Sequence, residues 1–235
     1  MQTSVSADEI ARFDALAARW WDPDGPMRPL HRMNPVRIGW IHDRIRARFS
    51  DAPVRVLDVG CGAGLAAEAL ARRGFQVLGL DAAAEAIQAA RRHAAGQDFS
   101  LAYRVGVPEG LLDEGAQFPV VTALEVIEHV PDPHAFLRTL SRLVQPGGVL
   151  FVSTLNRTAC AFLSAKIGAE YVLRWLPVGT HDWRKFVTPA ELAAGLRAAG
   201  CRVADMTGMR FDPLSGRWRA DRNVAVNYMA MAVRD

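Results

Sequence analysis

The stretch Val54-Arg-Val-Leu-Asp-Val-Gly60-Cys-Gly62-Ala-Gly64 decides the fold of this chain. Its first half is apolar except for Arg55 and Asp58, as expected for a strand buried on both faces of a parallel sheet. The three glycines let the backbone approach a ligand closely, and the helix predicted after them points its free N–H groups at the same turn. A second predicted strand ends at Asp81, whose carboxylate can accept hydrogen bonds from ribose hydroxyls. The sequence therefore predicts a nucleoside-cofactor site.

The glycine spacing distinguishes between cofactors. A dinucleotide fingerprint, G-x-G-x-x-G, would place its third glycine where Leu65 stands. Asp58 adds a carboxylate beside the turn, which favours an ammonium group and would repel a pyrophosphate. S-adenosylmethionine carries an ammonium, a sulfonium and a ribose, and no phosphate. The run from Asp58 to Gly64, together with Asp81, resembles the first two motifs of class I S-adenosylmethionine-dependent methyltransferases.

Composition limits the class of protein. The 235 residues are 50% hydrophobic, enough for a core, and we expect one domain over residues 1–235. No run approaches the roughly 20 apolar residues of a membrane span, and the N-terminal residues do not form a signal peptide, so a cytoplasmic location is expected. Three widely spaced cysteines indicate neither a disulfide framework nor a zinc cluster. The formal charge of +3 does not argue for a nucleic-acid partner.

Strand-like and helix-like segments alternate along most of the chain. This predicts an α/β fold with a doubly wound, mostly parallel sheet of seven strands, whose ligands bind at the carboxyl ends of the strands. Residues 1–50 are predicted to form an N-terminal helical cap, with a second helix starting at Asn34 and Pro35. Residues 201–207 and 224–233 are predicted to be the last two strands and to close the sheet as an antiparallel pair.

Residues 156–186 interrupt this alternation with a long segment that is apolar, aromatic and basic. Such an insert could be a helical lid folded on its own core, or it could contact a lipid surface or cover an apolar substrate. The two interpretations are compatible.

Glu125, Glu128 and His129 follow the predicted fourth strand at spacings that put all three on one face if the turn there is helical. His129 could act as a base toward a substrate hydroxyl, supported by the two carboxylates. Alternatively, the three could hold a divalent cation such as Mg²⁺, which lowers the pKa of a hydroxyl. A helix N-terminus favours acidic residues for structural reasons alone, but that explanation does not cover His129.

Motifs over nearly the whole chain resemble those of the ubiquinone-biosynthesis O-methyltransferase family. They are Arg19-Trp-Trp-Asp, Leu30-His-Arg-Met-Asn-Pro-Val-Arg37, Asp58-Val-Gly-Cys-Gly, Glu125-Val-Ile-Glu-His-Val-Pro-Asp-Pro133, Ser153-Thr-Leu-Asn-Arg157, Gly179-Thr-His-Asp182 and Val226-Asn-Tyr-Met229.

The resemblance implies that S-adenosylmethionine methylates ring hydroxyls of polyprenylated catechol or demethylubiquinol intermediates. It implies cofactor contacts at Arg37, Gly60, Asp81 and Leu124, to which the glycine turn itself adds Asp58 and Gly62. It also implies that Glu125, Glu128 and His129 are the metal or base cluster. Because a polyprenyl chain stays in the bilayer, we further expect contact with a membrane surface, peripheral to its inner face, or with other enzymes of the pathway.

Other functions are compatible with parts of the sequence. A C-methyltransferase acting on a related ring would need a base and no metal. A non-catalytic S-adenosylmethionine-binding subunit would have no use for the Glu125, Glu128 and His129 group. Nucleic-acid methylation is disfavoured because no Asn/Asp-Pro-Pro-Tyr/Phe element follows the fourth strand. A nicotinamide dehydrogenase is disfavoured by the glycine spacing.

Overall fold

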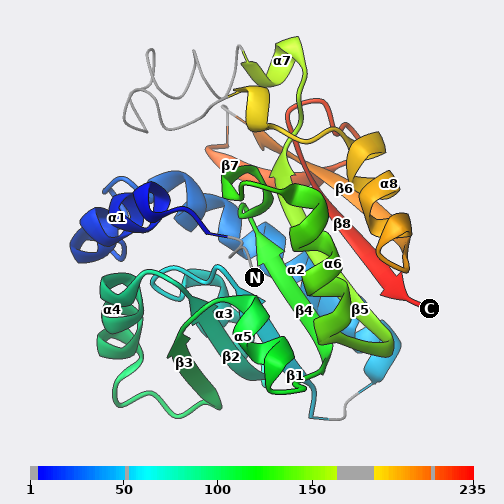
Figure 1. Ribbon diagram of the computed structural model, residues 1–235. Helices are drawn as coiled ribbons and strands as arrows, with labels where there is room; N and C mark the ends of the chain where they lie inside the picture. The colour runs from blue at the N-terminus through cyan, green and yellow to red at the C-terminus, as the bar shows by residue number, and fades with distance from the viewer. Residues whose placement is uncertain (1–4, 51–52, 163–182, 213–214) are drawn as a thin grey trace.

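The computed structural model describes residues 5–50, 53–162, 183–212 and 215–235. Within these residues, the chain forms one sheet that runs through the molecule (Figure 1). Its strands are β1 (Arg55–Val59), β2 (Gln76–Asp81), β3 (Leu101–Val105), β4 (Phe118–Leu124), β5 (Val144–Leu155), β6 (Cys201–Asp212), β7 (Arg217–Asp221) and β8 (Asn227–Arg234). They are ordered β3-β2-β1-β4-β5-β8-β6-β7.

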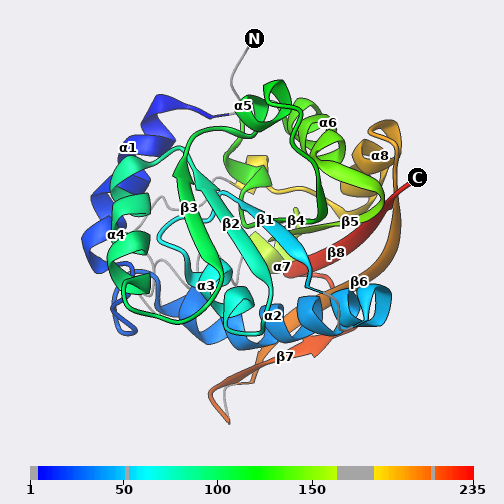
Figure 2. The same ribbon diagram turned by 90° about the horizontal axis from the view of Figure 1, so that it is seen from below.

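Helices precede the first strand and connect most of the others. They are α1 (Ala7–Leu16), η1 (Ala17–Arg19), α2 (Arg28–Phe49), α3 (Leu65–Ala71), α4 (Ala84–Ala94), α5 (Pro108–Asp113), η2 (Ile127–His129), α6 (Pro133–Leu143), α7 (Ala159–Ala161), η4 (Trp183–Lys185) and α8 (Pro189–Ala198). Figure 2 shows α5, α6 and α8 on one face of the sheet and α2 and α3 on the other. Each layer buries its own apolar cluster against the strands. None of the helices in the described ranges has the length and apolar character needed to cross a bilayer.

The predicted parallel sheet is confirmed, with one difference in strand number. β1 to β5 are parallel neighbours, while β8 runs antiparallel to both β5 and β6. Eight strands are present in the described residues where seven were predicted. Part of the region between the two predicted final strands belongs to a hairpin in which a longer β6, ending at Asp212, pairs with β7.

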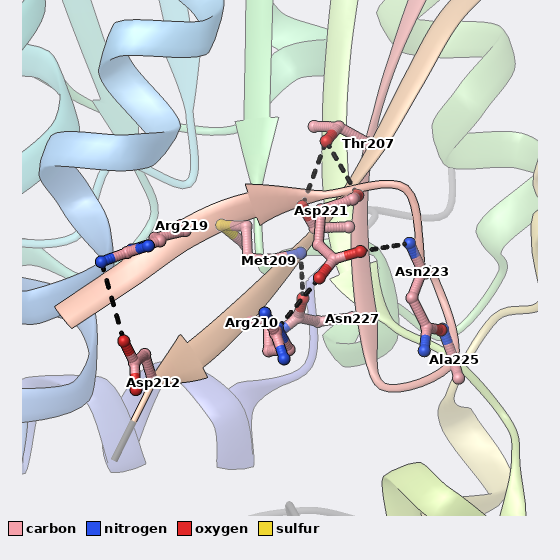
Figure 3. Close-up of polar contacts among 10 residues, drawn as sticks. Thr207, Met209, Arg210, Asp212, Arg219, Asp221, Asn223, Ala225 and Asn227 are labelled. Carbon is pink, nitrogen blue, oxygen red and sulfur yellow. Dashed lines mark hydrogen bonds and ion pairs between the residues drawn. The ribbon is translucent and has the colours of Figure 1, made fainter. Parts of the chain in front are cut away.

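Cross-strand ion pairs connect the two strands of this hairpin, whose apolar alternation is weak. Nε of Arg210 lies 3.0 Å from Asp221, and a guanidinium nitrogen of Arg219 lies 3.7 Å from Asp212 (Figure 3). Opposite charges on neighbouring strands stabilise such a pair. On the adjoining strand, the side-chain oxygen of Asn227 accepts a hydrogen bond from the backbone N–H of Met209.

The N-terminal helices form as predicted, but the second starts earlier. Ser6 caps α1, accepting a hydrogen bond from the backbone N–H of Glu9. The second helix begins at Arg28, not at Asn34, because Pro29 occupies its first turn, where a missing N–H has no cost. Asn34 is buried inside the helix, and its side-chain amide donates to the carbonyl of Leu65. The residue predicted to cap α2 therefore ties it to α3.

The segment predicted as an insert, residues 156–186, is described only at its two ends, and residues 163–182 lie outside the described part. At the described ends, the indole N–H of Trp183 donates to the carbonyl of Thr158. Side chains of Asn156 and Thr158 donate to the carbonyls of Val224 and Ala225 in the β7–β8 loop. The base of the insert is thus held by hydrogen bonds to the end of the sheet.

Candidate functional site

The glycine turn between β1 and α3 is packed so closely that only glycine fits. Gly62 has a φ of +53°, and a Cβ built on it would lie 2.3 Å from the ring of Trp20. Gly64, at φ +90°, would place a Cβ 2.0 Å from the hydroxyl oxygen of Tyr103. The left-handed backbone and these approaches together require residues without a side chain. The turn therefore has a fixed shape, and Trp20, from the segment before α2, lies directly against it.

Asp81 holds this turn from the end of β2. Its carboxylate accepts hydrogen bonds from the backbone N–H of Gly62, at 2.7 Å, and from that of Ala83, at 2.8 Å. Burial raises the pKa of Asp81, and these two hydrogen bonds oppose the rise. The carboxylate predicted to bind ribose thus also fixes the turn. Its contact with a ribose stays a prediction.

Arg37 and Asp58 bring two opposite charges to one place below the turn. Arg37 is 3% exposed and Asp58 is 2% exposed. Asp58 accepts a hydrogen bond from Thr122 through Oδ1, and Arg37 donates one to Asn34. Nε of Arg37 and Oδ2 of Asp58 are buried without a hydrogen-bond partner among the described residues. Burial, only partly offset by Thr122 and Arg37, raises the pKa of Asp58 to about 6.

One pocket gathers most of the residues singled out from the sequence. It is lined by all the predicted cofactor contacts and two of the predicted catalytic residues: Arg37, Asp58, Gly60, Gly62, Asp81, Leu124, Glu125 and His129. Glu128 does not line it. Residues of α1 form the opposite wall, among them Glu9, Ile10 and Phe13. Two segments far apart in the sequence therefore enclose the same space.

Glu125 and Glu128 lie at the carboxyl end of β4, as predicted, and both are bound by hydroxyl groups of β5. Glu125 has a left-handed φ of +58°, and its carboxylate accepts from Ser153 at 2.7 Å. Glu128, 5% exposed, accepts from Thr154 at 2.9 Å. Burial and the neighbouring Glu125 charge raise the pKa of Glu128 above its ordinary value.

His129 is turned toward a different partner. Its Nδ1 lies 3.2 Å from Oε2 of Glu9 on α1, and its ring meets Phe13 edge-on, with the ring centres 5.4 Å apart. Burial disfavours the charged imidazole, but the Glu9 and Glu128 carboxylates more than offset this, so the pKa of His129 is raised.

These geometries do not fit the predicted metal set of Glu125, Glu128 and His129. Within residues 5–50, 53–162, 183–212 and 215–235, no group of three His, Cys, Asp or Glu side chains is arranged to hold a metal ion. The physical reason is the backbone, because Glu125 is left-handed and a 3₁₀ turn follows it in place of an α-helix. Each of the three side chains consequently has its own polar partner.

The contribution of α1 to the pocket was not predicted from the sequence. Ser6 and Glu9 have the spacing of a capping box, which assigns Glu9 a local role at the start of a helix. No spacing rule connects Glu9 with His129, because the two are distant in sequence and meet only in the folded chain. The run Arg19-Trp-Trp-Asp was the only signal that this region mattered.

Comparison with known proteins relates the sequence of this chain to methyltransferases. A model of the methyltransferase domain matches residues 31–205. The ubiquinone biosynthesis O-methyltransferase of Methylobacterium nodulans is 49% identical over 239 residues, covering 98% of this chain and 96% of that protein. The enzyme of the same name from Caulobacter vibrioides is 47% identical, covering 99% and 96%.

Among solved structures, magnesium protoporphyrin IX methyltransferase from Synechocystis PCC 6803, with bound SAH, superposes with a TM-score of 0.69. It is 20% identical and the match covers 97% of this chain and 100% of that one, so it shows the shared fold. The family model and the near full-length relatives establish more than the fold: the chain belongs to the ubiquinone biosynthesis O-methyltransferase family.

Proposed function

We propose that the chain transfers the methyl group of S-adenosylmethionine to a ring hydroxyl of a polyprenylated catechol or demethylubiquinol intermediate of ubiquinone biosynthesis. Membership of the family supports the reaction, since its relatives carry the name ubiquinone biosynthesis O-methyltransferase. The observation that carries the cofactor assignment is the buried pair of unpartnered atoms, Nε of Arg37 and Oδ2 of Asp58, in residues that line the pocket.

This pair suits the amino-acid end of S-adenosylmethionine. A guanidinium binds a carboxylate, and a carboxylate binds an ammonium, so Arg37 and Asp58 match both charges of that end. Buried polar atoms without partners are costly, which makes a ligand that satisfies both the simplest explanation for their presence. Asp81, at the other side of the glycine turn, is the candidate for the ribose hydroxyls. When bound, the cofactor supplies an electrophilic methyl group on a sulfonium.

His129 is the residue we assign as the base. With Nδ1 toward Glu9, its Nε2 carries the lone pair that can accept the proton of the substrate hydroxyl. Phenols have a pKa of about 10, so proton removal at the moment of transfer assists the reaction near neutral pH. Glu125 lines the pocket, and Glu128 is buried next to His129. Their negative charges favour the positive imidazolium that results. No step is assigned to a metal, because the side chains of the predicted set have separate partners.

The test is transfer of labelled methyl groups from S-adenosylmethionine to a short-tailed demethylated quinol. We compare wild type, His129→Ala and a histidine control, His134→Ala, which changes an exposed residue outside the pocket. His129→Ala should lower kcat by about 100-fold or more. His134→Ala should behave as wild type, and EDTA should have no effect. Loss of activity in EDTA, restored by Mg²⁺, would replace the base assignment with a metal. No product with any phenolic acceptor would refute the proposed reaction.

We further propose that the polyprenyl tail is presented from a membrane surface. The support is the pathway in the relatives' name, ubiquinone biosynthesis, together with the apolar, basic composition of residues 156–186. Flotation with anionic liposomes tests this directly. Protein that stays at the bottom of the gradient at low salt would contradict it.

A further inference from the structure

Glu9 occupies the third position of α1, where a capping-box glutamate usually bonds to the backbone of its own helix. A second helix of this chain provides the comparison. In α8, Thr188 and Glu191 make both bonds of the box. In α1, Ser6 accepts from the Glu9 N–H, but the Glu9 carboxylate is turned toward the pocket. The carboxylate is therefore used for something other than capping.

The surroundings of this carboxylate are unusual for a helix that buries none of its residues fully. The Glu9 side chain is only 16% exposed, and its Oε2 makes no well-aligned hydrogen bond with any described residue. Three basic side chains from different helices lie near this carboxylate: His129 at 3.2 Å, Lys185 at 3.8 Å and Arg12 at 4.0 Å. The interaction with His129, opposed by burial, lowers the pKa of Glu9. The contact thus joins an ionised carboxylate to the imidazole.

We propose that Glu9 is the positioning residue for His129: α1, lying over the pocket, brings the Glu9 carboxylate to Nδ1 of the imidazole and so fixes Nε2 as the nitrogen that faces the substrate. This inference rests on the proposed O-methyl transfer and adds a residue to it. A carboxylate 3.2 Å from Nδ1 favours the neutral tautomer whose proton is on that nitrogen, so Glu9 selects the tautomer. The edge-on contact of Phe13, one turn along α1, restricts the orientation of the same ring.

The consequence is that the base is complete only when α1 is in place. Phe13, Glu9 and Ile10 line the pocket from the α1 side, opposite the glycine turn. A chain with α1 displaced would keep Arg37, Asp58 and Asp81 for the cofactor. It would lose the orientation of His129. Cofactor binding and methyl transfer are therefore separable by changes in α1.

The experiment compares Glu9→Ala and Glu9→Gln with Ser6→Ala in the full-length protein. Ser6→Ala removes the cap of α1 without altering the carboxylate, so it reports any general weakening of the helix. Glu9→Ala should lower kcat by about tenfold to 100-fold while the KM for S-adenosylmethionine and the affinity for S-adenosylhomocysteine stay within about twofold. Glu9→Gln, which keeps an oxygen acceptor, should recover part of the loss. Ser6→Ala should keep kcat near the wild-type value.

A second measurement reads the imidazole directly. In ¹⁵N-histidine-labelled protein with S-adenosylhomocysteine bound, at a pH at which the imidazole is neutral, the His129 resonances, identified by their absence in His129→Gln, should show a proton on Nδ1 and none on Nε2. This signature should be lost in Glu9→Ala and kept in Ser6→Ala. The proposal is overturned if Glu9→Ala keeps both kcat and the Nδ1 proton, or if Ser6→Ala changes them equally. An active wild type with an inactive His129→Ala and a fully active Glu9→Ala would refute this inference alone. An inactive wild type would refute the proposed function.

Discussion

The glycine turn and α1 line the same pocket but differ in how deeply they are buried. The turn is built into the core: Ala63 beside its glycines is fully buried, and Trp20 and Tyr103 pack against it. α1 buries no residue fully. Its Phe13 and Leu16 pack against the apolar cluster that contains Trp20 and Ala63. Polar contacts also join Glu9 to His129 and Asp14 to the N–H of Glu85. We therefore assign cofactor recognition to the buried turn, whereas the geometry of the base depends on a helix that has no fully buried residue.

The largest effect on cofactor binding is expected from distorting the glycine turn. Gly62→Ala places a Cβ at φ +53° and 2.3 Å from Trp20, so we expect at least a 100-fold loss of affinity for S-adenosylhomocysteine by calorimetry. A left-handed backbone costs a non-glycine residue about 1–2 kcal/mol before any clash is counted. Gly39→Ala is the control, since its Cβ meets nothing within 4 Å. Wild-type affinity in Gly62→Ala would show that the turn is not the rigid element.

A smaller effect is expected from Asp58, where cofactor binding and stability should change in opposite directions. Because the folded-state pKa of Asp58 is raised to about 6, the folded chain binds more protons than the unfolded chain between about pH 4 and pH 6. The free energy of unfolding therefore falls as pH rises through that window. With about 1.4 kcal/mol for each pKa unit, the fall due to Asp58 is about 3 kcal/mol. Asp58→Asn should abolish this pH dependence and stabilise the empty protein near pH 7, while weakening cofactor binding.

Urea unfolding across this pH range and calorimetry with S-adenosylhomocysteine measure both effects. Asp98→Asn, at an exposed aspartate, serves as the control and should follow wild type. A pH dependence of stability in Asp58→Asn equal to that of wild type would contradict the assignment.

The smallest effect should come from loosening α1 without touching Glu9. Asp14 accepts a hydrogen bond from Glu85 at the start of α4, where the cap residue Ala83 has no side-chain acceptor of its own. Asp14→Ala removes this hydrogen bond, which should weaken the attachment of α1 by roughly 1 kcal/mol. The release of S-adenosylhomocysteine should then be about fivefold faster. Stopped-flow dissociation measures the rate, with Asp8→Ala, an exposed residue of the same helix, as control. Equal release rates in the two variants would show that α1 does not limit product release.

Local patterns predicted the turn side of the pocket and failed on the α1 side. The apolar strand, the glycines and Asp81 are close in sequence, so their spacing carries their arrangement. Glu9 and His129 meet only because α1 folds over the ends of the strands, and no local signal records that contact. The spacing of Glu125, Glu128 and His129 would place them on one face only of a helical turn, and Glu125 is left-handed, so their arrangement also could not be predicted from local spacing.

The strand count shows the same limit in the fold. β1, β2, β4 and β5 were predictable because buried parallel strands are largely continuous apolar runs, whereas β3 is a short edge strand with exposed residues. β7 is a half-exposed strand with alternating arginines, and ion pairs connect it to β6 across the hairpin. Charge pairs of this kind are visible only after the register is known.

The position of β8 also sets the order in which the sheet can be assembled. β8 is synthesised after β6 and β7 but lies between β5 and β6, pairing with both. The β6–β7 hairpin can form early as a local unit, yet it has no edge to join until β8 has been made. Until then β5 presents unpaired N–H and C=O groups, which are a template for association between nascent chains. Completion of the sheet by β8 is therefore expected to be the slow, aggregation-sensitive step of folding, because its pairing with β5 closes a long loop.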